Sequence, residues 1–340
     1  MTNSNSIQGI YEVGIGCVDS QTQIQYWEQF GYTVGKIGEL SVAAANNLYG
    51  VNSALKSFRL EHQDADHGLI RLMEWENPIN AGLQLSSMKM KGTRWATALT
   101  IDILYILNHA EEAARIGFPI KYTPAFWEVI YNKERRIRPF LEEPMGVREM
   151  MLFQPLTRQV FFQRFGYAMP NYGKINKEVP FLTSQITHAG MIVQDDSKEV
   201  LRFYEETLGL LRARDDMETT YDSSDAGKAF FELQPGEKFI VTAFDDPRSS
   251  NNNLQNARSG RLYIIRFPES IKLESGFQRA QPGCLGMSLY TYRVGDIADY
   301  FHRVQASAAQ KFSEIEVNEF GEKSFSFVAP DGYFWTLVSS

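Results

Sequence analysis

Two ionisable residues stand inside apolar segments, a setting that favours proton-transfer chemistry. Glu12 lies between Tyr11 and Val13, where an isolated carboxylate has to be paired or takes up a proton more readily than in water. Such a carboxylate can remove a proton next to a carbonyl group, so Glu12 is our first candidate for a general base. His188 is the second candidate, as a proton shuttle. Each has a structural alternative: a glutamate bonded to arginine, and a hydrogen-bonded core histidine.

Other chemistry-bearing residues give weaker signals. The run His62–His67 contains ligand-type side chains, but its place between two predicted strands favours a polar turn over a metal site. Gly14-Ile15-Gly16 lacks the third glycine and the following helix of a dinucleotide-binding fingerprint. Glu74 and Glu149 could join Glu12 in holding a divalent cation weakly. Their alternatives are a surface charge at a strand end and an ion pair with arginine.

A repeated pattern must position these residues. Each copy predicts a strand ending in Asp, an amphipathic helix closed by Gly, and later a strand centred on Ser/Ala-Phe. The helix-capping positions are Asp19, Asp102, Asp196 and Asp296, and the helix-ending glycines are Gly31, Gly117 and Gly209. The later strands are expected at Ser57–Leu60, Ala229–Glu232 and Ser324–Phe327. The second copy is the most diverged, with Trp95–Ile101 as its first strand.

The repeat also predicts the domain organisation. A chain of 340 residues, 44% of them hydrophobic, can form two domains of ordinary size. Between residues 156 and 182 the pattern stops, which indicates a crossover between two halves. We therefore expect an α+β protein with an N-terminal domain of paired βαβββ units at 1–155 and a C-terminal domain of paired units at 183–340.

The C-terminal motif is Pro330-Asp331-Gly332-Tyr333-Phe334-Trp335-Thr336-Leu337. The repeated units and this motif resemble the vicinal-oxygen-chelate superfamily. This is the glyoxalase, bleomycin-resistance and extradiol-dioxygenase group. The resemblance covers nearly the whole chain as four units. It implies that paired units curl into open half-barrels and that the ligand sits in the concave mouth. It does not fix the chemistry, because the superfamily includes isomerases, dioxygenases, transferases, lyases and drug-binding proteins.

The resemblance also implies where metal ligands would stand, on the first and last strands of paired units. The matching first-strand positions are Glu12, Trp95, His188 and either Leu289 or Cys284, and Thr336 stands where a ligand glutamate would precede Leu337. Ring-cleaving dioxygenases need two imidazoles and a carboxylate around ferrous iron. The C-terminal pair offers His188 alone, so we expect no cofactor, with a divalent metal as the weaker alternative.

Aromatic residues are expected to wall the pocket. The candidate substrate-binding residues are Trp95, Trp127, Glu149, Tyr290, Tyr292 and Trp335. They suit an aromatic or apolar small molecule with a carbonyl group. The leading prediction is a metal-independent lyase, isomerase or epimerase acting on an aromatic or polyketide-like compound, with Glu12 or His188 moving the proton. The alternatives are a non-catalytic, drug-resistance-like binding protein and a divalent-metal glyoxalase-like enzyme.

Composition limits the partners. The net charge of −7 disfavours nucleic acid and anionic membranes. No apolar run reaches the roughly 20 residues that span a bilayer, and Met1–Ser6 lacks the features of an export signal, so a cytoplasmic location is expected. Cys17 and Cys284 lie far apart within apolar strands and are predicted to be free, buried thiols. Four units can close two half-barrels within one chain, so a monomer and a homodimer are both open.

Overall fold

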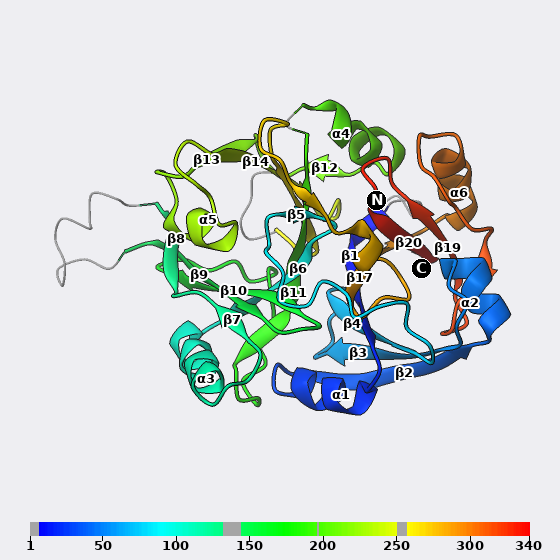
Figure 1. The fold of residues 1–340 in the computed structure, drawn as a ribbon, viewed down its shortest axis with the longest axis horizontal. Helices are drawn as coiled ribbons and strands as arrows, with labels where there is room; N and C mark the ends of the chain where they lie inside the picture. The colour runs from blue at the N-terminus through cyan, green and yellow to red at the C-terminus, as the bar shows by residue number, and fades with distance from the viewer. Residues whose placement is uncertain (1–6, 132–143, 196, 250–256) are drawn as a thin grey trace.

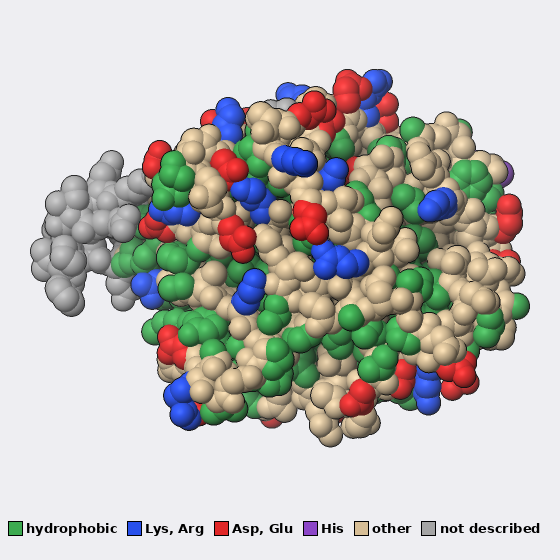
Figure 2. All heavy atoms as spheres, viewed as in Figure 1, with side chains coloured by type: hydrophobic (Ala, Val, Ile, Leu, Met, Phe, Trp, Pro, Cys, Tyr) green, Lys and Arg blue, Asp and Glu red, His purple; other side chains and the backbone are tan. Residues whose placement is uncertain are grey.

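The computed structural model describes residues 7–131, 144–195, 197–249 and 257–340. The segment Met1–Ser6 and the expected cap Asp196 lie outside the described residues. In the described part, no helix is both long and apolar enough to cross a bilayer. Cys17 and Cys284 are free and buried, as predicted. Figure 2 shows acidic and basic side chains interspersed over one face of the molecule.

The first two units contain the predicted strand, helix and strand in order, but the first adds a second helix and the second has four strands after its helix within the described residues. The first contains β1 (Ile7–Cys17), α1 (Ser20–Glu28), β2 (Tyr32–Leu40), α2 (Val42–Tyr49), β3 (Leu55–His62) and β4 (Leu69–Trp75). A short β5 (Met90–Lys91) precedes the second unit. This unit contains β6 (Arg94–Thr100), α3 (Ile103–Arg115), β7 (Lys121–Tyr122), β8 (Phe126–Ile130), β9 (Gly146–Phe153) and β10 (Arg158–Phe165).

The last two units differ mainly in their helices. The third contains β11 (Thr183–Val193), α4 (Glu199–Arg202), a π-helical turn at Phe203–Thr207, β12 (Leu211–Arg212), β13 (Met217–Thr220), α5 (Asp225–Phe230), β14 (Lys238–Asp245) and β15 (Arg261–Arg266). After β16 (Glu274–Ser275) and a 3-10 turn at Phe277–Arg279, the fourth contains β17 (Gly286–Val294), α6 (Ile297–Gln305), β18 (Glu316–Val317), β19 (Lys323–Val328) and β20 (Phe334–Ser339).

The predicted helix boundaries are confirmed where the structure describes them. The carboxylates of Asp19, Asp102 and Asp296 each accept a hydrogen bond from a backbone amide in the first turn of the helix that follows. The glycines that follow the helices, Gly31, Gly117 and Gly209, have φ angles of 90°, 82° and 73°. Side chains other than glycine are strained in this left-handed region. Local hydrogen bonding therefore sets the length of each helix.

Most of the strands form two large curled sheets, which confirms the α+β half-barrel architecture (Figure 1). The short strands β5 and β16 pair separately with each other. We call the sheet β18-β19-β20-β17-β1-β4-β3-β2 the outer-unit sheet, because it joins the first and fourth units. The inner-unit sheet joins the second and third units in the order β12-β14-β15-β11-β6-β10-β9-β7, with β13 on β14 and β8 on β9. The expected pairing of consecutive units was wrong. All four units share one pattern, so the sequence does not distinguish which first strands pair.

Two further expectations from the sequence need correction. The crossover predicted at 156–182 contains β10, which pairs with β6 and β9 as the last strand of the second unit. The strand predicted at Ala229–Glu232 is instead the end of α5 and the turn after it. The Ser224 hydroxyl caps this helix by accepting a hydrogen bond from the Gly227 amide, a local signal that overrides the Phe-rich strand pattern.

Tyrosine hydroxyls of the fourth unit tie the two sheets together. The hydroxyl of Tyr290 on β17 donates to the Gly190 carbonyl at 2.6 Å and accepts from the Trp95 amide at 3.0 Å. The Tyr333 hydroxyl donates to the Ile192 carbonyl at 2.7 Å. These buried hydroxyls satisfy polar groups that water does not reach. Within the inner-unit sheet, Gly190 leaves room for the Trp95 ring, because a Cβ atom there would lie 1.9 Å from it.

The bridge between the sheets predicts a stability loss for Tyr290→Phe. Removing one hydroxyl leaves buried amide and carbonyl groups unpaired, which costs about 1–3 kcal/mol of unfolding free energy. Urea denaturation measures this cost, and the matched control is Tyr105→Phe, at a residue that is exposed on α3. Equal unfolding free energies for the two variants would contradict the role of the bridge.

Candidate active site

The inner-unit sheet curls around a cavity of about 350 Å³. Strand alternation decides which side chains face it, because residues two apart on a strand share a face. The lining includes Trp95 and Thr97 on β6, Glu128 on β8, Glu149 on β9, Phe162 and Arg164 on β10, His188 on β11, and Arg261 and Tyr263 on β15. The loop before β13 adds Arg214, and α5 contributes Phe230. The cavity therefore combines aromatic walls with a small set of ionisable groups.

His188 stands at the centre of this sheet, paired with Thr97 on one side and Arg261 on the other. Its Nδ1 atom lies 3.1 Å from the Thr187 hydroxyl, which donates its own hydrogen to the Thr97 carbonyl. That hydroxyl accepts from His188 when the proton of the neutral ring is placed on Nδ1, which is the tautomer that we assign from this contact. In this tautomer the Nε2 atom carries a lone pair.

The surroundings keep His188 uncharged. Burial lowers the pKa of the imidazole well below its usual value, and the positive charges of Arg261, Arg164 and Arg214 lower it further. The ring packs edge-on against Tyr263, with the ring centroids 5.0 Å apart. An imidazole that is neutral at pH 7 keeps a lone pair on one ring nitrogen, which can accept a hydrogen bond or a proton.

Two carboxyl groups face the same cavity from the β8–β9 hairpin. The pairing of these strands shifts by one residue between Trp127 and Val129, so Glu128 is the extra residue of a bulge. Its carboxylate accepts a hydrogen bond from the Ser224 hydroxyl at 2.7 Å. Burial, and then the charge of Glu128, raise the pKa of Glu149 to about 8. At neutral pH Glu149 is therefore protonated and can donate a hydrogen bond.

Three guanidinium groups complete the polar lining. Arg261 is paired with Asp245 at 2.5 Å and donates to the Tyr263 hydroxyl at 3.0 Å. Arg164 lies over the rings of Phe162 and Tyr172 and donates to the Tyr172 carbonyl at 3.2 Å. Arg214 is exposed at the cavity and acts on both His188 and Glu149. Positive charge therefore surrounds the neutral imidazole.

These residues do not fit a metal centre of the kind that ring-cleaving dioxygenases use. Such a centre needs two imidazoles and a carboxylate, whereas the cavity offers His188 beside three arginines. Across residues 7–131, 144–195, 197–249 and 257–340, no three His, Cys, Asp or Glu side chains gather closely enough to hold a metal. In the His62–His67 run, His62 packs against Tyr32, while His67 bonds to Asp66 and Ser259.

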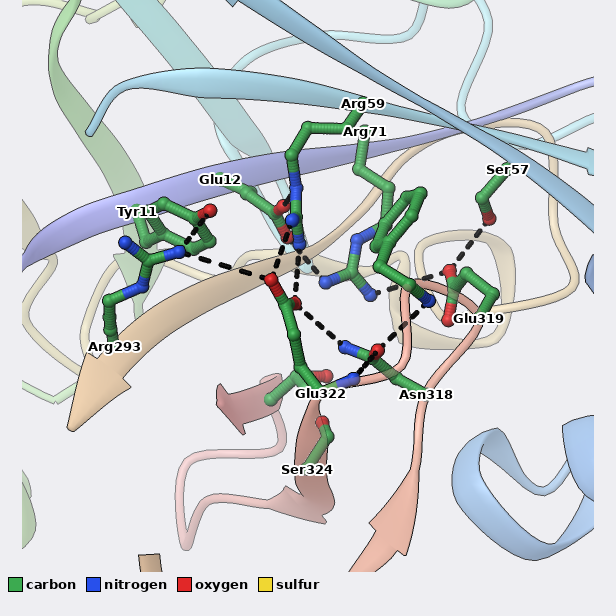
Figure 3. Close-up of polar contacts among 12 residues, drawn as sticks. Tyr11, Glu12, Ser57, Arg59, Arg71, Arg293, Asn318, Glu319, Glu322 and Ser324 are labelled. Carbon is green, nitrogen blue, oxygen red and sulfur yellow. Dashed lines mark hydrogen bonds and ion pairs between the residues drawn. The ribbon is translucent and has the colours of Figure 1, made fainter. Parts of the chain in front are cut away.

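Glu12 occupies the concave face of the other sheet, where arginines neutralise it (Figure 3). It is fully buried and forms ion pairs with Arg59 on β3 and Arg71 on β4. Arg59 also contacts both carboxylate oxygens of Glu322, at 2.8 and 2.7 Å. This is the structural alternative for Glu12, a glutamate bonded to arginine. Both of its oxygens are engaged, so we do not place proton transfer there.

The turn between β18 and β19 fills the same half-barrel. Glu319 accepts hydrogen bonds from the Ser57 hydroxyl at 2.7 Å and from the Tyr49 hydroxyl at 3.0 Å. The Phe320 ring lies under the guanidinium groups of Arg59 and Arg71, with centroids 4.1 and 5.3 Å away. Figure 3 shows this turn reaching toward Glu12 from the strands of the fourth unit. Charged side chains thus fill the concave face of the outer-unit sheet, whereas the concave face of the inner-unit sheet encloses a cavity.

Of the remaining predicted site residues, some line the cavity and others lie outside it. Trp95 and Glu149 line the cavity with His188. Tyr290, Tyr292 and Trp335 are fully buried away from it, with Tyr292 and Trp335 stacked at 5.3 Å. The last predicted residue, Trp127, packs against Phe165 and Arg148.

Glu128, Arg164, Arg214 and Arg261 are cavity residues that the sequence reasoning missed. One available signal was the run Val160-Phe161-Phe162, because β-branched and aromatic residues are enriched in strands. The segment was instead assigned to the crossover. Glu128 gave no comparable signal, because a bulge changes its direction.

The ionic cluster predicts that Glu12→Gln destabilises the protein strongly. The change leaves Arg59 and Arg71 buried with less negative charge, and breaking one side of a buried pair costs about 3–5 kcal/mol of unfolding free energy. The matched control is Arg115→Ala, which removes an exposed pair with Glu112 and is expected to change little. Urea denaturation compares them, and a Glu12→Gln variant as stable as the control would contradict the analysis.

Comparison with known proteins agrees with this architecture. No known protein family matches the sequence, and no curated protein does. Among solved structures, a putative dioxygenase from Bacillus subtilis has a TM-score of 0.56 at 11% identity, covering 98% of this chain and 86% of that one. A variant of glyoxalase I from Zea mays has a TM-score of 0.54 at 13% identity, covering 98% and 94%. Glyoxalase I from the same plant has a TM-score of 0.52 at 12% identity, covering 98% and 92%.

These proteins share the arrangement of curled sheets, while their low identity carries no information about residue roles. The four-unit repeat, the two half-barrels and the structural neighbours agree with one another. The chain therefore has the fold of the vicinal-oxygen-chelate superfamily, as its repeat and its Pro-Asp-Gly ending predicted.

Proposed function

We propose that this protein is a metal-independent acid–base enzyme, an isomerase, epimerase or lyase, that acts on a small carbonyl compound in the inner-unit cavity. The observation that supports the proposal is the pairing of a neutral imidazole, His188, with a protonated carboxyl group, Glu149, in one cavity. Opposite shifts of two titratable groups are the usual mark of an assigned base and an assigned acid.

The proposed step is proton removal from the carbon next to the carbonyl. The Nε2 lone pair of His188 takes this proton, and the C–H electron pair forms the double bond of an enol. Glu149 gives its proton to the carbonyl oxygen, so no isolated negative charge develops in the cavity. Return of a proton to the other face gives epimerisation, return to another carbon gives isomerisation, and loss of a neighbouring leaving group gives elimination.

The aromatic side chains that line the cavity favour a substrate with a flat, apolar body. Trp95, Phe162, Phe230 and Tyr263 line the cavity with Met88. Aromatic faces bind flat apolar ligands, and a thioether adapts to irregular ones. A volume of about 350 Å³ is within the usual range for small-molecule sites. The proposed substrate is therefore a carbonyl compound with an aromatic or similarly apolar body.

Deuterium exchange tests this proposal. Benzylacetone, a neutral aromatic ketone, is incubated with the protein in D₂O, and NMR follows deuterium entry next to the carbonyl. We expect exchange faster than in buffer, reduced by about 10²-fold or more in both His188→Asn and Glu149→Gln. His109→Asn is the matched control, because His109 lies on exposed α3. Binding of the ketone without any exchange would favour the non-catalytic binding protein.

The pKa of Glu149 predicts the pH dependence of exchange. The neutral acid donates to the carbonyl oxygen, so kcat/KM is expected to fall as the pH rises through about 8, where Glu149 ionises. His188 stays neutral well below its usual pKa, so no matching loss is expected near neutral pH on the acid side. Measuring kcat/KM for deuterium exchange as a function of pH checks both the acid and the alkaline limb of the profile. An alkaline limb that persists unchanged in Glu149→Gln would contradict the assignment.

A further inference from the structure

The charges of the cavity do not balance. Arg261 is matched by Asp245, and Glu149 is neutral at pH 7, since its pKa is raised to about 8. Arg164 and Arg214 then face Glu128, whose own pKa is raised by burial. A buried positive charge without a counterion is costly. A ligand that supplies negative charge would reduce this cost.

Arg164 is the residue best placed to receive that charge. Burial lowers the pKa of Arg164, while nearby tyrosines raise it, and one of them, Tyr167, also hydrogen-bonds to its side chain. No acidic side chain among the described residues pairs with Arg164. Its guanidinium lies over the rings of Phe162, Tyr167 and Tyr172, with centroids 5.1, 6.0 and 5.1 Å away. Ring contacts occupy the faces of a guanidinium and leave N–H groups on its edge. One Nη atom of Arg164 already donates to the Tyr172 carbonyl, and the remaining N–H groups can bind an anion.

The position of Arg164 relates the anion to the reacting group. Arg164 follows Phe162 on the same face of β10, and Phe162 contacts His188 with ring centroids 5.4 Å apart. The Tyr172 hydroxyl lies 3.4 Å from His188 Nδ1, while the Tyr172 carbonyl accepts from Arg164. One small molecule can therefore reach both residues at once.

We propose that the ligand of this cavity carries a carboxylate beside its enolisable carbonyl, and that Arg164 binds this carboxylate. The inference rests on the proposed function for the carbonyl, but the carboxylate site stands on the uncompensated guanidinium. A carboxylate matches the planar N–H edge of arginine through two parallel hydrogen bonds. Arg214, which is exposed at the cavity, adds attraction during binding. The substrate class is an apolar or aromatic keto acid.

A matched pair of probes tests the proposal. Phenylpyruvate and its methyl ester share the ring and the ketone and differ in charge. Deuterium exchange next to the ketone gives kcat and KM for each, with the buffer rate subtracted. We expect the KM of the ester to exceed that of the acid by about tenfold or more, the effect of a hydrogen bond to a charged group. Equal KM values for acid and ester would overturn the carboxylate site.

Variants locate the site. Arg164→Gln should raise the KM of phenylpyruvate by about tenfold or more and leave the KM of the ester nearly unchanged. Arg164→Lys should recover part of the affinity for the acid alone, because it keeps the charge and loses the planar edge. The control Arg202→Gln removes a charge from exposed α4 and should change neither value. A parallel loss for acid and ester in Arg164→Gln would show a structural role and overturn the assignment.

Failure of the proposed function is separable from failure of the carboxylate site. If neither probe exchanges, calorimetry still measures the binding of phenylpyruvate and of its ester. Binding of the acid that depends on Arg164, without exchange, would support the carboxylate site and overturn the acid–base function. Exchange of both probes with equal affinity would support the function and overturn the carboxylate site.

Discussion

The antiparallel pairing of first strands is the constraint on which the rest of the structure depends. β1 pairs with β17 and β6 pairs with β11, so the first strands form the middle of each sheet. Residues on their concave faces lie at the base of each half-barrel and are cut off from water. Glu12 and His188 occupy these places. An ionisable group at this depth has to be neutralised by a partner or remain uncharged.

The two sheets meet this requirement in opposite ways. Glu12 is paired with two buried arginines, and the turn that carries Glu319 and Glu322 adds further carboxylates and fills the space. His188 stays neutral, so the imidazole itself needs no counterion, and its half-barrel is hollow. In the filled half-barrel, buried ion pairs occupy the space that a ligand would need. The hollow one keeps a titratable group within reach of a small molecule, which is why we assign the chemistry to it.

The local sequence pattern predicted the four repeat units. It did not predict which strands of different units pair with each other. The capping carboxylates of Asp19, Asp102 and Asp296 are local hydrogen-bond signals, and all three hold. The sequence also singled out His188 and Glu149 among the cavity residues. It could not show that Glu12 meets Arg59, because that contact depends on the register of strands far apart in the chain. It could not show that β6 pairs with β11, because any two first strands of the repeat satisfy the same pattern.

The acid and the base of the cavity owe their protonation states to different causes, and this decides how a bound anion acts. Burial and three guanidinium charges lower the pKa of His188, while burial and the charge of Glu128 raise the pKa of Glu149. A carboxylate bound at Arg164 offsets the positive field and adds a negative charge. It therefore raises the pKa of both groups. His188 becomes a stronger base, while Glu149 stays protonated to higher pH but becomes a weaker acid. The proposed carboxylate thus strengthens the base and keeps the acid in its protonated form, so binding and chemistry would depend on the same charges.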